Sequence, residues 1–414
     1  MRKKNRLVIL CHLLLPIILL LMPSPSQAQG ISGTWKGELN TRMFKLPIVM
    51  HITADGQCTL DSPQQKANDI PAELLYRSDD SISISCPTIN ASYTARIQRD
   101  TLSGTFTQHG QKMPLIMIAG AYEARRPQTP QPPFPYATEE VQFVNDEAGA
   151  TLAGTLCLPA NVERPPVVLM VTGSGQQNRD EELFLHRPFA VLADYLARHG
   201  IASLRYDDRN YAASKGGDNA NATTLDLAED AHAGIKWLRH SGRFSKVGLL
   251  GHSEGGAIGF ILGNKGLLDF IVSLAGPALK GDTLLLLQQK AALGPLAGFA
   301  NIESLRANIL LSANPWLLFY IDYDPKSDIA GTKCPVFALN GSKDIQVISA
   351  PNLDALRNTL PPNKHHQFKE YPELNHLFQH CTTGHPKEYG TIEETISEEV
   401  LSDIAEWIRE CFGR

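Results

Sequence analysis

The chain has 414 residues, of which 43% are hydrophobic and 20% charged, which is ordinary for a soluble globular protein long enough for two or three domains. It carries 38 Lys and Arg against 43 Asp and Glu, a net charge of −5, and no basic stripe is visible in its sequence. A nucleic-acid partner is therefore not expected.

The first predicted element is a secretory signal peptide at residues 1–28. Four basic residues lie within 1–6, an apolar run covers 7–22, and small residues stand just before position 29. This pattern predicts cleavage after Ala28 and an exported protein, either periplasmic or extracellular. The alternative is a permanent membrane anchor, but the run has about 16 residues and a spanning helix needs roughly 20. We therefore expect no membrane span once the signal peptide is removed.

Six cysteines follow the predicted signal peptide. In an exported protein they could form disulfides, and our preferred pair is Cys58 with Cys86. The alternative is six buried thiols in a chain large enough to fold without cross-links. The six are Cys58, Cys86, Cys157, Cys334, Cys381 and Cys411.

Residues 29–122 are predicted to form a small all-β, barrel-like domain. Short runs of alternating apolar and β-branched residues are separated by Gly, Asp, Asn and Ser, which is typical of strands and turns. The opening Gly33-x-Trp35-x-Gly37 resembles the start of lipocalin-like small barrels, and we interpret its tryptophan as a plug for one end of the barrel. Residues 123–137 are rich in proline and predict a stiff, exposed linker.

Residues 138–414 are predicted to form an α/β domain. Apolar strand-like runs alternate with amphipathic helical stretches, which predicts a mostly parallel sheet covered by helices on both faces. Residues 278–329 form a helical insertion rich in Leu and Ala. We expect this insertion to lie over the site as a lid and to line its pocket. The alternative is a helical subdomain with a small core of its own.

The stretch "LLGHSEGGAIG" at 249–259 carries the strongest chemical signal. Gly-x-Ser-x-Gly is common by composition alone, but here it follows an apolar strand and precedes the small-residue start of a helix. This context predicts a nucleophile elbow that holds Ser253 on a strained turn. Glycines are expected at 251 and 255 because the incoming strand and the outgoing helix pass too close for a β-carbon.

A serine nucleophile needs two backbone N–H groups to stabilise an oxyanion. One is expected from Glu254, the residue after the serine, and the other from the loop after the strand at 167–171. That loop reads "TGSGQQNRDE", so Ser174 or Gly175 could present the second amide. The alternative is a plain turn.

The serine also needs a base, and the base needs an acid to orient it. Asp344 follows a predicted strand and His376 follows the next one, roughly 30 residues later with a helix between, as this fold places them. Asp207 and Asp208 are rival acids, but they follow a strand that precedes the serine and more plausibly bond the loop backbone. Other histidines are expected to be solvated or locally hydrogen-bonded: His365, His366, His380 and His385.

A metal site is the competing chemistry. His376 and His380 have i,i+4 spacing, which could place both imidazoles on one helix face. The Glu of a zinc hydrolase motif is missing, and the Ser/Asp pattern would go unexplained. The sequence also has no phosphate-binding loop or dinucleotide fingerprint, so we predict neither metal nor cofactor.

From Glu139 onward the sequence resembles α/β-hydrolase-fold carboxylesterases of exported bacterial proteins, the group with a small β-rich domain ahead of the hydrolase. The matching pieces are "GSGQQNRDE", "LRYDDR", "GHSEGG", "LNGSKDIQV" and "LNHLFQ". The resemblance implies Ser253 as nucleophile, Asp344 as acid and His376 as base, the same residues that the motifs indicate. One departure is Asn210, where the family usually has Gly after the Arg, and it concerns the loop beside the pocket.

The sequence thus predicts a secreted serine carboxylesterase that hydrolyses small to medium acyl esters through an acyl-enzyme. Its expected partner is a small-molecule ester. A peptidase or amidase of the same fold is an alternative, although a β segment of about 90 residues is too short for the propeller of propeller-bearing serine peptidases. An acyltransferase or thioesterase would share the chemistry. A non-catalytic envelope or glycan-binding protein is the alternative from another class.

Overall fold

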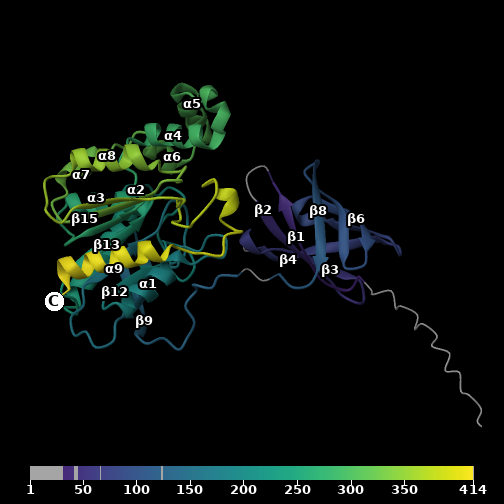
Figure 1. Cartoon of the computed structure of the whole chain (residues 1–414), viewed down its shortest axis with the longest axis horizontal. Coiled ribbons are helices and arrows are strands. Elements are labelled where there is room, and N and C mark those ends of the chain that lie inside the picture. The colour runs from purple at the N-terminus through teal and green to yellow at the C-terminus, as the bar shows by residue number, and fades with distance from the viewer. Residues whose placement is uncertain (1–30, 42–44, 66, 123–124, 414) are drawn as a thin grey trace, which may run out of the picture.

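The computed structural model describes residues 31–41, 45–65, 67–122 and 125–413, so the predicted signal peptide lies outside the described residues. Figure 1 shows a β-barrel followed by a larger part in which helices surround a sheet. None of the helices in the described ranges is long and apolar enough to cross a bilayer.

The first part is a closed barrel. Its strands follow one another in chain order, and β1 pairs with both β2 and β8, which closes the ring. Apolar side chains fill the interior, among them Trp35, whose Nε1 donates to the carbonyl of Ile31 at 2.8 Å. The prediction of an all-β domain is confirmed. Its elements are β1 (Gly33–Asn40), β2 (Lys45–Ile52), β3 (Gln57–Ser62), η1 (Pro63–Gln65), β4 (Ala67–Arg77), β5 (Ser81–Cys86), η2 (Pro87–Ile89), β6 (Ala91–Gln98), β7 (Thr101–Gln108) and β8 (Gln111–Ala119).

The predicted Cys58–Cys86 disulfide is wrong, because both thiols are free and buried in the barrel core. Cys58 lies on β3 and Cys86 on β5, with β4 between them. Two strand spacings separate their backbones by roughly 9–10 Å, whereas a disulfide joins Cα atoms less than about 7 Å apart. The barrel core therefore uses these cysteines as small apolar side chains.

Exposed and half-buried residues alternate in the segment after the barrel, and several of its side chains bind the α/β domain. Arg126 Nη2 donates to the carbonyls of Phe184 and Gly390, each at 2.8 Å. Gln128 Nε2 donates to the carbonyl of Ile396 at 2.7 Å. Prolines cannot donate from the backbone, so this segment pairs with the α/β domain through side chains instead. Figure 1 shows the yellow segment before α9 reaching the side of the barrel.

The second part is built on an eight-stranded sheet with the order β16-β15-β14-β13-β11-β12-β10-β9. Neighbouring strands pair in parallel along the series β12, β11, β13, β14, β15 and β16. At the other side of the sheet β10 pairs antiparallel with both β12 and β9. This mostly parallel sheet confirms the α/β-hydrolase fold. The strands are β9 (Ala137–Asn145), β10 (Ala150–Leu158), β11 (Val167–Val171), β12 (Ala202–Tyr206), β13 (Val247–His252), β14 (Ile271–Leu274), β15 (Val336–Gly341) and β16 (Gln367–Tyr371).

Helices cover both faces of the sheet and form two separate cores (Figure 1). α2, α3 and α8 pack on one face, for example through Ile235, Ile258 and Leu353. α1 and α9 pack on the other, for example through Leu192 and Trp407. The helices are α1 (Pro188–Arg198), α2 (Thr224–His240), α3 (Glu254–Asn264), α8 (Ser349–Thr359), η4 (Pro386–Glu388) and α9 (Glu398–Phe412).

The predicted insertion between two sheet strands lies between β14 and β15 and is helical. Its outer helices project from the sheet (Figure 1), and Phe299 and Leu311 on them are 81% and 83% exposed. Its elements are α4 (Gly281–Leu293), η3 (Gly294–Phe299), α5 (Ile302–Ser312), α6 (Pro315–Tyr320) and α7 (Lys326–Gly331).

Candidate active site

Ser253 lies on a sharp turn between β13 and α3. Its backbone has φ 52° and ψ −118°, a strained conformation for a residue with a side chain, and its N–H donates to the carbonyl of Leu274 at 2.8 Å. A β-carbon at 251 would lie 2.1 Å from the carbonyl oxygen of Gly255. One at 255 would lie 2.1 Å from the carbonyl oxygen of Val171 on β11. Glycine is therefore required at both positions, as predicted. At 255, however, the backbone that excludes a β-carbon belongs to β11 and not to the incoming strand β13.

The structure brings Asp344 and His376 together. Asp344 lies in the turn after β15 and His376 in the loop after β16, and Asp344 Oδ2 is 2.7 Å from His376 Nδ1. The other carboxylate oxygen accepts the backbone N–H groups of Gln346 and Val347 at 2.8 and 2.9 Å. Both side chains are buried, so bulk water does not compete for this contact. The carboxylate therefore fixes the orientation of the imidazole.

The serine elbow touches the loop that carries His376. His252 precedes Ser253, and its Nε2 donates to the backbone carbonyl of His376 at 2.9 Å. The centroids of the two imidazole rings are 4.6 Å apart. Ser253, Asp344 and His376 follow β13, β15 and β16, so all three lie at the carboxyl ends of the parallel strands.

The loop after β11 passes directly beside the serine. A β-carbon at 173 would lie 3.3 Å from the β-carbon of Ser253. The N–H of Gly173 is bound by Glu181, but among the described residues nothing accepts the N–H of Ser174, Gly175 or Glu254. These three amides, at a helix start and in the neighbouring loop, remain available to stabilise an anion.

Asp207 and Asp208 bond the backbone of this same loop. Asp207 Oδ1 accepts the N–H of Arg179 at 2.7 Å, and Asp208 Oδ2 accepts the N–H of Gln177 at 2.7 Å. Burial raises the pKa of Asp208 to about 7, and the carboxylate of Glu254 adds to this shift. Both aspartates thus shape the loop that carries Ser174 and Gly175.

Asn210, at the departure from the family pattern, has φ 52°. This is the left-handed region that favours glycine and that asparagine tolerates better than most residues. The chain can therefore make the turn at 210 without the glycine.

A cavity of about 390 Å³ adjoins the site. Ser174 and Gly175 form part of one wall, and Trp316 and Leu317 of α6 form part of another. Glu254 fixes this wall, because its Oε1 accepts the Nε1–H of Trp316 at 2.7 Å. Burial raises the pKa of Glu254 despite such donors. A larger cavity of about 630 Å³ between the barrel and the α/β domain contains none of the predicted site residues.

The sequence did not indicate two residues of this region, Glu181 and His252. His252 Nδ1 is 2.8 Å from Glu181 Oε1, and both side chains are buried. Burial alone would lower the pKa of His252, but the Glu181 carboxylate raises it above the usual value. In the sequence, the only signal for His252 is its position next to Ser253. Glu181 has no such signal, because it lies in an ordinary acidic run.

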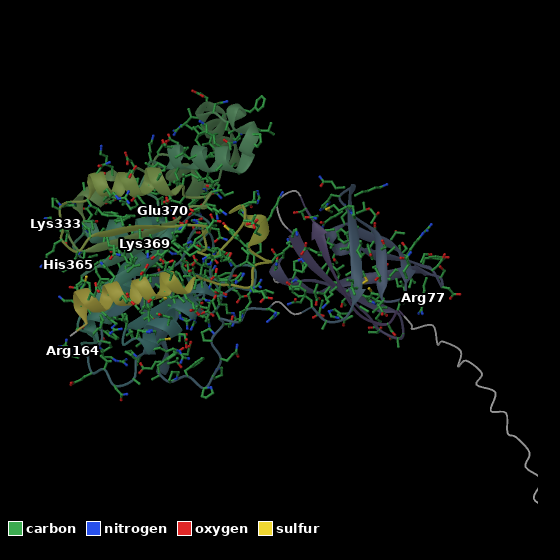
Figure 2. All side chains as sticks on the ribbon, in the orientation of Figure 1. Arg77, Arg164, Lys333, His365, Lys369 and Glu370 are labelled. Carbon is green, nitrogen blue, oxygen red and sulfur yellow. The ribbon has the colours of Figure 1, made fainter. Side chains whose placement is uncertain are left out.

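The competing histidines lie elsewhere. His365 is exposed at the end of the α/β domain that faces away from the barrel (Figure 2). His366 Nε2 is 2.9 Å from the carbonyl of Pro361, and His380 is exposed and pairs with Glu394. Residues 376–380 do not form a helix, so the spacing that suggested a metal pair does not place both imidazoles on one face.

Fold and site geometry together define an α/β-hydrolase-fold protein with a serine elbow. Residues 187–326 match the family model described as serine aminopeptidase, S33, a stretch that includes Ser253 but ends before Asp344.

Among characterised proteins, the chain is similar to Esterase EstD of Thermotoga maritima, with 27% identity over 279 residues, 62% of this chain and 65% of that protein. It is also similar to an acyl transferase of Shewanella hanedai, with 33% identity over 97 residues, 23% of this chain and 31% of that protein. The chain thus spans just under two thirds of the first relative and about a third of the second.

Two solved structures are similar at lower identity. The Pyrococcus furiosus esterase Pf2001 aligns with a TM-score of 0.46 and 15% identity, over 70% of this chain and 99% of that one. Est1E of Butyrivibrio proteoclasticus, with ferulic acid bound, aligns with a TM-score of 0.47 and 17% identity, over 66% of this chain and 100% of that one.

Proposed function

We propose that the protein is a serine carboxylesterase that hydrolyses small to medium acyl esters. The observation that carries the proposal is the strained Ser253 elbow in contact with the loop of a buried Asp344–His376 pair. The similarity to an esterase over 279 residues supports the same chemistry. Export belongs to the proposal as well, supported by the sequence pattern of residues 1–28.

Each residue has a defined role in the proposed reaction. Ser253 Oγ attacks the ester carbonyl carbon while His376 Nε2 takes the hydroxyl proton, and Asp344 holds the imidazole in the tautomer that this requires. The negative oxygen of the tetrahedral intermediate lies against the N–H of Glu254 and an amide of Ser174 or Gly175. His376 then protonates the leaving alcohol, which leaves an acyl-enzyme.

The second half of the reaction repeats the first with water. His376 takes a proton from water, whose oxygen attacks the acyl carbonyl, and the second tetrahedral intermediate collapses to release the acid. Ser253 recovers its proton from His376. No cofactor takes part in these steps.

The cavity beside Ser174 sets the size of the substrate. Its volume of about 390 Å³ is near the lower end of the range for small-molecule pockets, roughly 300–1,000 Å³. Trp316, Leu317, Leu227 and Ala222 give it apolar surface, which suits an acyl chain or an alcohol of modest size. This supports short and medium esters over long-chain lipids.

Acyl transfer is the second candidate, favoured by the similarity to an acyl transferase over 97 residues. The same acyl-enzyme would then pass its acyl group to an alcohol rather than to water. Product analysis with an added alcohol acceptor separates the two, since only a transferase forms mostly the new ester.

Intact-mass labelling with a fluorophosphonate tests the proposal, together with turnover of p-nitrophenyl esters of rising acyl length. We expect one adduct, its loss in Ser253→Ala, and turnover of the short esters. Ser327→Ala is the matched control, because Ser327 is exposed on α7. Labelling without ester turnover would favour a peptidase or transferase. No labelling would refute a serine hydrolase and favour a binding protein.

A further inference from the structure

A buried ion pair joins the serine elbow to the loop after β11. His252 Nδ1 and Glu181 Oε1 are 2.8 Å apart, and the side chains are only 7% and 2% exposed. Buried charges are costly unless they are paired and hydrogen-bonded, so such a pair is kept only where its geometry is well satisfied. The reaction proposed above gives this pair no chemical step.

Each member of the pair also holds a second active-site segment. Glu181 Oε1 accepts the N–H of Gly173 at 2.8 Å, directly before the proposed oxyanion donors. His252 Nε2 donates to the backbone carbonyl of His376 at 2.9 Å. One buried pair thus connects the loop of Ser174, the serine elbow and the loop of His376.

The hydrogen bonds define the protonation of His252. Nε2 faces a carbonyl, which only accepts, so this nitrogen carries a proton. Nδ1 faces Glu181 Oε1, which also accepts the N–H of Gly173, and the raised pKa of His252 favours a proton on Nδ1 as well. Besides Glu181, the titratable groups that face this ring are His376 and Asp344, from the loops after β16 and β15.

The backbone at Glu181, like that at Ser253, has a positive φ. Its φ of 51° lies in the left-handed region, although the residue is not glycine. Strained residues persist where surrounding contacts hold them and are concentrated at functional sites. Here the holding contacts include the two hydrogen bonds to Glu181 Oε1 and the bond from the N–H of Glu181 to the carbonyl of Asn178 at 2.9 Å.

We propose that Glu181 and His252 are positioning residues that hold the oxyanion loop and the His376 loop in register with Ser253. The inference rests on the proposed function, because it assigns the pair a role in that reaction. Among the described residues, neither side chain is hydrogen-bonded to Ser253 Oγ or to the ring of His376. Removal of either side chain is expected to lower kcat and leave KM nearly unchanged, since small displacements of catalytic groups cost about 100-fold in rate.

Two substitutions of His252 each cut one arm of the connection. Asn can replace the Nδ1 donor toward Glu181 but does not reach the carbonyl of His376, whereas Gln can replace the Nε2 donor toward His376 but leaves Glu181. Glu181→Gln keeps an oxygen that accepts from Gly173 and His252, while Glu181→Ala removes it. The matched controls are His232→Gln and Glu229→Gln, which break a His–Glu pair on α2.

The rate constant for labelling of Ser253 by a fluorophosphonate is measured for each variant, with kcat and KM for a short p-nitrophenyl ester and the thermal midpoint. We expect His252→Asn, His252→Gln and Glu181→Ala to lower the labelling rate and kcat by about 30- to 100-fold with KM within threefold. Glu181→Gln should recover most of the rate, and the α2 controls should match wild type.

The result that overturns the inference is wild-type labelling and kcat in folded His252→Asn and His252→Gln, or a loss confined to KM. These two variants decide the matter even if Glu181→Ala does not fold. A wild-type protein that fails to label would instead refute the proposed function, and the inference with it.

Discussion

Replacement of Asp344 by Asn should nearly abolish activity without unfolding the protein. Asp344 Oδ1 accepts two backbone N–H groups, from Gln346 and Val347, so the amide oxygen of Asn must take this position. Its NH₂ group then faces His376 Nδ1, where Oδ2 now lies at 2.7 Å. Nδ1 must become an acceptor, so the ring proton moves to Nε2 and the imidazole can no longer take the proton of Ser253.

The magnitude follows from this change of tautomer. A carboxylate-to-amide change at this place in a catalytic triad lowers kcat by about 10⁴-fold. That factor corresponds to about 5 kcal/mol of transition-state stabilisation. KM should change little because Asp344 is buried behind His376 and does not reach the cavity.

The assay is steady-state hydrolysis of a short p-nitrophenyl ester, with urea unfolding to confirm the fold. Asp354→Asn is the matched control, since Asp354 is exposed on α8 and pairs only with Arg357 among its described neighbours. A variant that retains more than a tenth of the wild-type kcat would refute Asp344 as the acid that orients His376.

Three further predictions concern stability, pH and the thiols. Gly255→Ala should lower the free energy of unfolding by about 1–3 kcal/mol, because its β-carbon would meet a carbonyl oxygen of β11. The control Gly298→Ala should not lower it, because a β-carbon at 298 has open space around it. Urea unfolding measures both. Asp208 is held with a pKa of about 7 by burial, so the folded state keeps its proton while the unfolded state loses it near pH 4. Wild type should therefore lose unfolding free energy relative to Asp208→Asn as the pH rises from 5 to 8, and a pH-independent difference would contradict this. Alkylation in denaturant without reductant should modify both Cys58 and Cys86, as mass spectrometry would show, whereas a disulfide would leave the two unmodified.

Much of the fold could be predicted from the sequence because its signals are local. The apolar run at 167–171 is a strand buried along its whole length, and the motif at 249–259 contains strand, turn and helix in one stretch. The order of Asp344 and His376 along the chain reflects the order of the strands that they follow, which the fold determines.

The contacts that the sequence did not reveal join distant segments. Glu181 and His252 are 71 positions apart, and nothing in either neighbourhood indicates the other. Gln128 binds Ile396 across 268 positions, although a proline-rich stretch predicts only an extended segment. Closeness in the sequence can also mislead. Cys58 and Cys86 are near each other along the chain, but β4 lies between the strands that carry them.

The bond between Gln128 and Ile396 has a consequence for the timing of synthesis. Ribosomes add roughly 5–20 residues per second, so about 13–54 s pass between the two residues, which are 268 positions apart. Ser253 and its elbow emerge within this interval, whereas His376 emerges near its end. For most of this interval a nascent chain therefore carries the proposed nucleophile without its proposed base, and the bond between Gln128 and Ile396 forms only after both have been made.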